Sequence, residues 1–333
     1  MEGGSGDSKR MTSSAGPSFE AIGPWSSDSK VALACSGGAD STFLALKWLD
    51  FARSLGGQAP PAIVWVVDHG HRTGSAEEAR KAKAIYLKMG LEAHILQAHR
   101  EEKPPKGESG LRELRYGLFA KAAIEGDVSV ILTAHHADDQ AETVLLRILR
   151  GTGLRGLAGI PERRWLTEFE MPDVEIRRPL LKCRGAQIRK YLSQVGQNWI
   201  EDPTNIDSRA AVRNFLRHDV FPLLAASSPA DPISSFLKLA DEAQSWREWV
   251  GKGFLEDGQD WLADWEHLPS VLRREGIAEI LRRNQHVVSR RRVMDLEGAL
   301  LNNRSASVDE IDRICIAKGR LRLERRSDPQ KRR

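Results

Sequence analysis

The chain has 333 residues, 41% of them hydrophobic and 29% charged, which is typical of a globular protein of one or two domains, and no apolar run reaches the roughly 18–20 residues of a membrane span. Its 50 Lys and Arg exceed its 46 Asp and Glu by four, so the composition allows a polyanionic partner without requiring one. The cysteines Cys35, Cys183 and Cys315 lie far apart and form no CxxC pair, which disfavours a disulfide framework or a thiolate zinc site and is typical of a cytoplasmic protein.

Residues 1–30 are rich in Gly and Ser and lack an apolar signal-peptide core, so we expect a disordered leader outside the fold. From residue 31 onward, short apolar runs alternate with segments of helical periodicity. Strands are expected at 31–35, 62–70, 93–99 and 128–136, and helices at 41–52, 77–91, 111–125 and 138–150. This alternation predicts an α/β fold with a doubly wound parallel sheet, in which ligands bind beyond the carboxyl ends of the strands.

The pattern changes after about residue 224. Residues 227–235 (SSPADPISS) are typical of a linker, and helical segments follow at 236–254, 271–283 and 291–301. We therefore expect a first domain over residues 31–224 and a small helical domain over residues 225–333. The basic end of the chain, GRLRLERRSDPQKRR, is expected to be a solvated tail.

A loop with two glycines joins the first expected strand to the first helix. Glycine lets a phosphate approach the backbone closely, and the free amides and the dipole at a helix N-terminus favour negative charge there. The structural alternative is an ordinary strand-to-helix turn in which Asp40 or Ser41 is the N-cap. The candidate phosphate-binding residues are Ser36, Gly37, Gly38, Ala39, Asp40 and Ser41.

A dense polar cluster, AHHADDQAET at residues 134–143, joins the fourth strand to the next helix. One interpretation is a capping box in which Asp139 caps the helix and Glu142 bonds back to the cap amide. That interpretation leaves His135 and Asp138 without a role. Asp138 and Glu142 lie four residues apart and share a helix face, with Asp139 beside them, which favours a hard cation such as Mg²⁺. The cluster lacks a third soft ligand, so zinc is disfavoured.

The loop SGGADS resembles the SGGxDS loop of the ATP pyrophosphatase superfamily, whereas GxGxxG and GxxxxGK[ST] do not occur. Over residues 31 to about 224, the chain further resembles the bacterial tRNA(Ile)-lysidine synthases, because several stretches stand in the order found in that family. These stretches are SGGADS (36–41), VDHGHR (67–72), LRELRY (111–116), AHHADDQAETVLLRILRGTGLRGLAG (134–159), RRPLL (177–181), EDPTNID (201–207) and RNFLR (213–217). VDHGHR departs from the family, which more often has asparagine and leucine there, so His71 and Arg72 receive no role.

The resemblance implies an adenine-nucleotide α-hydrolase-like fold and an ATP-dependent ligase that forms a carbon–nitrogen bond. Enzymes of this family adenylate C2 of the wobble cytidine in the CAU anticodon of tRNA(Ile). They then attach L-lysine with release of AMP, which changes the codon read from AUG to AUA. The resemblance therefore implies ATP, Mg²⁺, L-lysine and tRNA(Ile) as partners, and a second domain that positions the tRNA. It leaves the oligomeric state open.

Residue by residue, the resemblance assigns Mg²⁺ to Asp40 and Asp139, whose oxygens suit a hard cation. It also points to Arg112 in LRELRY and Arg213 in RNFLR as catalytic arginines, which would hold a phosphate or stabilise transition-state charge. For each arginine the structural alternative is a surface ion pair.

Lysine must attack as the free amine, although its ordinary pKa of about 10.4 keeps it protonated at neutral pH. A carboxylate must therefore accept a proton, and the sequence does not choose among Asp138, Asp139 and Glu142. Together with His135, Asp138 and Glu142 are the candidate substrate-binding residues.

Two tryptophans, Trp165 and Trp199, are either stacking platforms for a splayed base or core residues. Three other functions compete with lysidine synthesis: base thiolation by a related tRNA-modifying ATP pyrophosphatase, passive nucleotide binding, and RNA binding alone. Thiolation by such enzymes depends on cysteine persulfides or on iron–sulfur clusters held by CxxC pairs, and this chain has no CxxC pair. A passive nucleotide site would not need clustered carboxylates, and RNA binding alone does not explain SGGADS.

Overall fold

The computed structural model describes residues 16–17, 19, 23–25, 30–56, 58–70, 74–97, 107–166, 171–201, 212–255, 264–317 and 320–325. His71, Arg72 and residues 202–211 lie outside this set. The chain forms two compact units: Met1–Gly151 with Leu157–Asp241, and Thr152–Gly156 with Glu242–Arg333. The units divide inside a long helix near residue 241, whereas the sequence places the boundary near residue 225.

The first unit is built on a six-stranded sheet of order β3-β2-β1-β4-β6-β5. All neighbouring strands are parallel except β5 and β6, which are antiparallel. The α/β prediction with a doubly wound sheet is confirmed, although β5, β6 and α6 were not expected. The elements up to the edge strand are β1 (Lys30–Ala34), α1 (Ala39–Ser54), β2 (Ala62–Asp68), α2 (Ser75–Lys88), β3 (Glu92–Gln97), α3 (Gly107–Gly126), β4 (Val128–Thr133), α4 (Ala137–Leu149), α5 (Leu154–Leu157), β5 (Arg163–Leu166), β6 (Met171–Arg177) and α6 (Gly185–Gln194).

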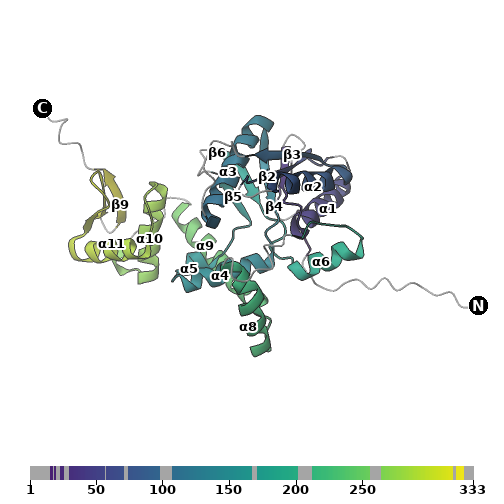
Figure 1. Cartoon of the computed structure of the whole chain (residues 1–333). Coiled ribbons are helices and arrows are strands. Elements are labelled where there is room, and N and C mark those ends of the chain that lie inside the picture. The colour runs from purple at the N-terminus through teal and green to yellow at the C-terminus, as the bar shows by residue number, and fades with distance from the viewer. Residues whose placement is uncertain are drawn as a thin grey trace, which may run out of the picture. The chain divides into compact units, whose positions relative to one another are not determined.

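Alternate residues of the central strands pack into two different cores, one on each face of the sheet. On β1, Val31 and Leu33 face a core formed with α1, α2 and α6. Ala32 faces the other core, where Tyr116 and Phe119 of α3 pack. Figure 1 shows these helices around the strands. Because both faces are covered, the strands have the continuous apolar runs that were visible in the sequence.

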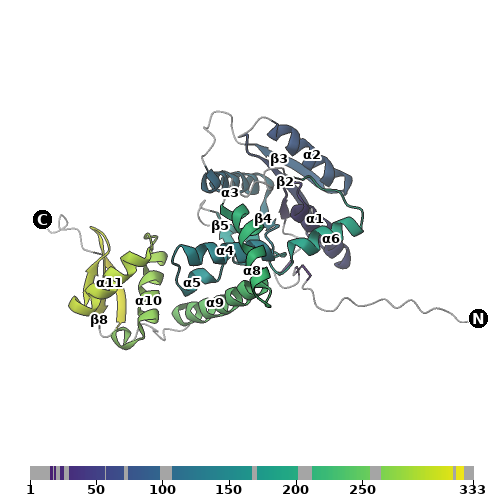
Figure 2. The same cartoon turned by 60° about the horizontal axis from the view of Figure 1, so that its bottom comes forward.

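A smaller core joins α4 to the helices that follow the sheet. These are α7 (Val212–Phe215), a π-helical turn (Leu216–Val220), α8 (Phe221–Ser227) and α9 (Pro232–Leu255). Ala141 of α4 packs with Phe221 and Ile233, so α8 and the start of α9 lie beside α4 (Figure 2). The expected linker at 227–235 corresponds to the short break between Ser227, where α8 ends, and Pro232, where α9 begins. Asp231 accepts hydrogen bonds from Ser234 and begins α9, whose Pro at the first position suits a helix start.

The expectation that residues 1–30 stay outside the fold is also wrong for two aromatic residues. Phe19 is only 3% exposed and stacks on Phe51, with ring centroids 5.2 Å apart. Trp25 meets Trp48 edge to face at 5.1 Å. Burial of large aromatic surfaces stabilises this packing, whereas the Gly and Ser content around them suggested disorder.

The sequence suggested a purely helical second unit, but this unit also contains a β-sheet. Helices α10 (Ser270–Arg283) and α11 (Arg290–Asn303) pack on a three-stranded antiparallel sheet of β7 (Ser305–Ser307), β8 (Asp312–Ala317) and β9 (Arg320–Arg325). The expected basic tail thus supplies a strand, because Leu321 and Leu323 alternate with charged residues and turn toward the core. None of the helices in the described ranges is both long and apolar enough to cross a bilayer.

Candidate functional site

The site forms where the strand order reverses. Strands β1 and β4 are neighbours, and the loops at their carboxyl ends lead to α1 and α4 on the two sides of this switch point. In open α/β sheets, ligands bind at such a crevice. The topology therefore places the SGGADS loop beside the AHHADDQAET cluster, although almost 100 residues separate them.

The glycine loop requires glycine at position 37. Gly37 has φ +91°, and a Cβ there would lie 2.8 Å from Ala82 Cβ and 2.9 Å from Ile200 Cδ1. Its carbonyl accepts a hydrogen bond from the Ile200 amide at 2.9 Å, which ties the end of the RRPLL-to-EDPTN segment to the loop. The loop is therefore packed from two directions and held in one shape.

Gly37→Ala is expected to lower the free energy of unfolding by about 2–4 kcal/mol, because it combines left-handed backbone strain with overpacking. Gly74→Ala is the matched control, since Gly74 has φ +96° but nothing within 4 Å of an added Cβ. Urea denaturation of both variants separates the two contributions. Equal losses would contradict the crowding at position 37.

The sequence suggested that the backbone amides of the loop are free to bind a ligand, but two of them are already hydrogen-bonded within the loop. Ser41 Oγ accepts hydrogen bonds from the amides of Ser36 and Gly37, each at 3.2 Å, and donates to the Gly38 carbonyl at 3.0 Å. The interpretation of Asp40 or Ser41 as N-cap is wrong, because Gly38 is the N-cap of α1 and no side chain in the described set caps it. The first amides of α1 remain available to an anion.

The acidic cluster contains a capping box, but it is not the predicted one. The N-cap of α4 is His136, whose Nδ1 accepts hydrogen bonds from the amides of Asp138 and Asp139. The Asp139 carboxylate in turn accepts the His136 amide proton at 3.0 Å. Glu142, which was expected to bond back to the cap, lies a turn further along α4. Histidine is not among the preferred N-cap residues, so the pattern was not recognisable from sequence.

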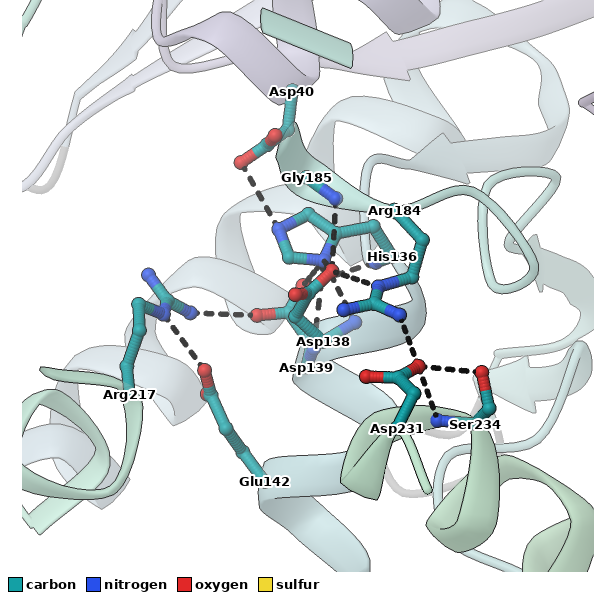
Figure 3. A network of polar contacts seen from close by, with 10 residues as sticks. All are labelled: Asp40, His136, Asp138, Asp139, Glu142, Arg184, Gly185, Arg217, Asp231 and Ser234. Carbon is teal, nitrogen blue, oxygen red and sulfur yellow. Dashed lines mark hydrogen bonds and ion pairs between the residues drawn. The ribbon is translucent and has the colours of Figure 1, made fainter. Parts of the chain in front are cut away.

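His136 links the two halves of the site (Figure 3). Its Nε2 lies 3.4 Å from Oδ2 of Asp40, and its Nδ1 faces Asp138 and Asp139 at 3.5 and 3.7 Å. Burial opposes the charged ring, but the carboxylates of Asp139, Asp40 and Asp138 raise the pKa of His136 to about 9. A proton on Nε2 faces Asp40 in both the neutral and the charged ring, so this contact holds the start of α1 next to α4. In the neutral ring Nδ1 accepts the amide protons of Asp138 and Asp139, whereas in the charged ring Nδ1 carries a proton that faces their carboxylates.

Arg217, in the π-helical turn, spans two acids of α4. Its Nη2 donates to Asp139 at 3.1 Å and its Nε to Glu142 at 2.7 Å. Burial opposes ionisation of Asp139, but His136, His135 and Arg217 lower its pKa, whereas burial raises the pKa of Glu142. Pro222 lacks the amide proton of a regular helix, and a π turn just before it accommodates that loss.

Asp138 points away from Arg217 and holds the start of α6. Its carboxylate accepts the Gly185 amide at 2.8 Å and lies 3.7 Å from Arg184 Nε. Arg184 also pairs with Asp231 at 2.5 Å. The three carboxylates of the cluster thus divide between two arginines on opposite sides (Figure 3).

The oxygens of this site suit a hard cation. Asp40 Oδ1 and Glu142 Oε2 are buried and find no hydrogen-bond partner within the described ranges. Buried carboxylate oxygens of this kind are acceptors that a cation would satisfy. Asp139 was predicted as the second ligand, but both of its oxygens already accept hydrogen bonds, from His136 and Arg217.

The remaining predicted residues are His135, Arg112 and Arg213. His135 is half-buried, and burial together with Arg178, Arg112 and Arg115 lowers its pKa to about 3, so its ring is neutral. Arg112 is exposed on α3, and its guanidinium lies over the Tyr116 ring. Arg213 lies on α7 close enough to Glu142 to oppose its raised pKa.

Sequence reasoning missed Arg217, Arg184 and His136. Arg217 stands four residues after Arg213 in the same motif, which was the available signal, since such residues share a helix face. The two tryptophans differ in burial. Trp165 is 50% exposed and is not a core residue, whereas Trp199 packs against the main core and donates to Glu201.

Comparisons with known proteins agree with this architecture. Residues 11–224 match the family of the PP-loop domain. The tRNA(Ile)-lysidine synthase of Pseudomonas putida is 34% identical over 241 residues, which are 69% of this chain and 54% of the relative. That of Bradyrhizobium diazoefficiens is 42% identical over 197 residues, 58% of this chain and 52% of the relative. This chain therefore spans about half the length of these curated relatives.

Among solved structures, the U34-tRNA thiolase NcsA from Methanococcus maripaludis with its 4Fe–4S cluster is similar with a TM-score of 0.51 and 16% identity, over 65% of this chain and 74% of that one. At this identity the similarity shows the fold alone. The PP-loop match covers residues 11–224, well over half of the chain, and includes the loop and the acidic cluster. The protein therefore belongs to the PP-loop family.

Proposed function

We propose that this protein is a tRNA(Ile)-lysidine synthase, which adenylates C2 of the wobble cytidine of a CAU anticodon and replaces the AMP with L-lysine. One observation carries the proposal: His136 joins Asp40, at the glycine loop, to the acidic N-terminus of α4. A phosphate-binding loop and a carboxylate cluster in contact suit a reaction that releases pyrophosphate and then uses an amine. The curated relatives named tRNA(Ile)-lysidine synthase support the choice of reaction.

The first step would take place at the start of α1. Pyrophosphate leaves as ATP donates AMP, and the open amides and dipole of α1 would stabilise its negative charge. Asp40 would hold Mg²⁺ through its unpartnered Oδ1, with Asp139 joining after Arg217 moves away. When bound, the ion would neutralise charge on the phosphates.

The second step needs a proton acceptor for the lysine ammonium. Glu142 suits this role, because burial raises its pKa and leaves Oε2 without a hydrogen bond in the described part of the chain. A carboxylate of raised pKa accepts a proton more readily than Asp139, whose pKa is lowered. Asp138 is held by the Gly185 amide and Arg184 and would serve to fix the site's shape.

Base thiolation is the nearest rival, and the cysteines argue against it. All three are free and buried. Burial raises the pKa of Cys35 to about 12 and that of Cys183 to about 11, so neither forms a thiolate at neutral pH. A reaction on tRNA and reduced, buried thiols also suit a cytoplasmic location.

Pyrophosphate release separates the classes of function. We expect release from ATP to depend on tRNA(Ile) with a CAU anticodon and to be absent with tRNA(Met), whose cytidine must not be modified. Release that does not require tRNA would contradict the proposal, and no release under any condition would favour passive nucleotide binding.

The second unit would position the tRNA through its phosphates. Helix α11 begins with Arg290, Arg291 and Arg292 and has no acid in its first turn, although positive charge is unfavourable at a helix N-terminus. Arg290 and Arg291 are exposed, whereas Arg292 donates to the carbonyls of Val287 and Val308. Two arginines kept at an unfavourable position favour an anionic partner.

Replacing Arg290 and Arg291 by Gln is expected to weaken tRNA binding about tenfold and to lower the log–log salt slope by roughly one to two. Stability and ATP binding should not change. Filter binding over a series of salt concentrations measures the slope, with Arg80→Gln on exposed α2 as the control. An unchanged slope would exclude α11 from the tRNA-binding surface.

A further inference from the structure

Three arginines surround one tyrosine on the α3 side of the sheet, and the reaction steps above use none of them. Arg112 belongs to α3, Arg164 to β5, and Arg178 directly follows β6. We call these three residues the arginine cluster. Arg112 and Tyr116 come from the LRELRY stretch and Arg178 from the RRPLL stretch, so the cluster brings two of the family-like motifs together.

Tyr116 organises the cluster. The guanidinium carbons of Arg112 and Arg164 lie 4.7 and 5.6 Å from the centroid of its ring. Arg178 hydrogen-bonds the phenol oxygen of the same side chain. Tyr116 belongs to α3 and is buried in the core between this helix and the sheet. A planar ring anchored in the core thus fixes the direction of two guanidinium groups and the position of the third.

Arg178 is the fully buried member of the cluster. It is only 1% exposed, an unusual environment for a guanidinium group. Its Nη1 donates to the Pro161 carbonyl at 2.7 Å, but its Nε is buried and has no hydrogen-bond partner within the described ranges. Burial without full pairing is costly, so an arginine in this state indicates an anion that completes its hydrogen bonds.

The positive charges extend beyond the three cluster residues to Arg147 on α4. Burial and the charge of Arg112 lower the pKa of Arg164, and burial with Arg112 and Arg213 lowers that of Arg147 on α4. Like charges held this close repel each other at a free-energy cost. A bound anion would offset the cost, and charges drawn from several elements suit more than one phosphate group.

We propose that the arginine cluster binds phosphodiester groups of the single-stranded anticodon loop beside the target nucleotide. The cluster lies on the α3 face, where Tyr116 packs, whereas the glycine loop leads into α1, which packs on the other face. The ATP phosphates therefore have their own site. Guanidinium forks match phosphate oxygens in geometry, and contacts of this kind position an RNA without reading its sequence. This inference rests on the proposed function, because it takes a tRNA as substrate.

Equilibrium binding of an anticodon stem-loop RNA to the full chain tests the inference. Arg164→Gln and Arg112→Gln should each weaken binding about tenfold at moderate salt and reduce the log–log salt slope by roughly 0.7–0.9. Tyr116→Leu, which removes the platform, should reduce the slope by more than either single change. Tyr116→Phe keeps the ring and should retain most of the slope. Arg80→Gln, on the exposed surface of α2, is the control of equal charge change.

ATP binding to the same variants distinguishes the two sources of phosphate. We expect ATP affinity within about twofold of the unmodified chain in Arg164→Gln and Arg112→Gln. A loss of ATP affinity with an unchanged RNA salt slope would assign the cluster to the nucleotide and overturn the inference. So would an unchanged slope in folded Arg112→Gln, which alters an exposed side chain and leaves the core intact. Binding is measured without turnover, so failure of lysine transfer by the unmodified enzyme would refute the reaction and leave this result standing.

Discussion

Asp40→Asn is expected to reduce tRNA-dependent pyrophosphate release by about 1000-fold or more. Asp40 lies at the start of α1, where its Oδ1 is buried without a hydrogen-bond partner in the described chain and its Oδ2 faces His136. Asparagine keeps the size of the side chain and an acceptor for His136, but it removes the charge that would hold Mg²⁺ against the leaving pyrophosphate. Loss of a charge at this point acts on the transition state.

The measurement is the rate of pyrophosphate release at saturating ATP and tRNA, together with a thermal melt. Asp50→Asn is the matched control, because it removes a carboxylate from an exposed position on the same helix, where it pairs with Lys47. The control should retain its rate, and both variants should melt within a few degrees of the unmodified protein. A rate for Asp40→Asn close to that of Asp50→Asn would remove Asp40 from the site.

Asp139→Asn is expected to lower adenylation by about 100-fold or more while the fold survives. The asparagine oxygen can still accept the His136 amide proton, so the capping box of α4 is kept. What is lost is the negative charge between His136 and Arg217. Asp139→Ala removes both charge and cap, and should cost about 1 kcal/mol more in unfolding free energy than Asp139→Asn.

Denaturant unfolding and adenylation rates, measured on both Asp139 variants, separate catalysis from capping. If Asp139→Asn works at the normal rate and only Asp139→Ala loses stability, Asp139 is a capping residue with no part in the chemistry. The same comparison at Asp138, which accepts the Gly185 amide, should show an effect on stability with a smaller effect on rate.

The central sheet could be predicted because most of its strands and helices are indicated by the local sequence pattern. Buried parallel strands such as Val128–Thr133 are largely apolar, and each is followed by a polar loop and a helix. The meeting of the SGGADS loop with the acidic cluster followed from the general rule for strand ends. Strand β5, Arg163–Leu166, is short, antiparallel and charged, so nothing in its sequence separated it from a loop.

The sequence indicated the carboxylates of the site, but it did not indicate the side-chain contacts that join them. His136 caps α4 although histidine is a rare cap, and its ring faces Asp40 because the sheet brings β1 beside β4. Arg217 points at Asp139 from a π turn whose register no helical pattern encodes. Both contacts depend on tertiary structure. In the second unit, β9 was missed for a different reason, because the alternation of Leu321 and Leu323 was outweighed by the charges around them.

Transfer of labelled lysine to tRNA tests the proposed reaction most directly. Purified protein is incubated with radiolabelled L-lysine, ATP and an unmodified tRNA(Ile) transcript with a CAU anticodon, and the tRNA is then digested to nucleosides. We expect label in one modified cytidine per tRNA, dependent on ATP and absent when the wobble cytidine is replaced by uridine. Pyrophosphate release that depends on this tRNA but leaves no lysine in it would contradict lysidine synthesis.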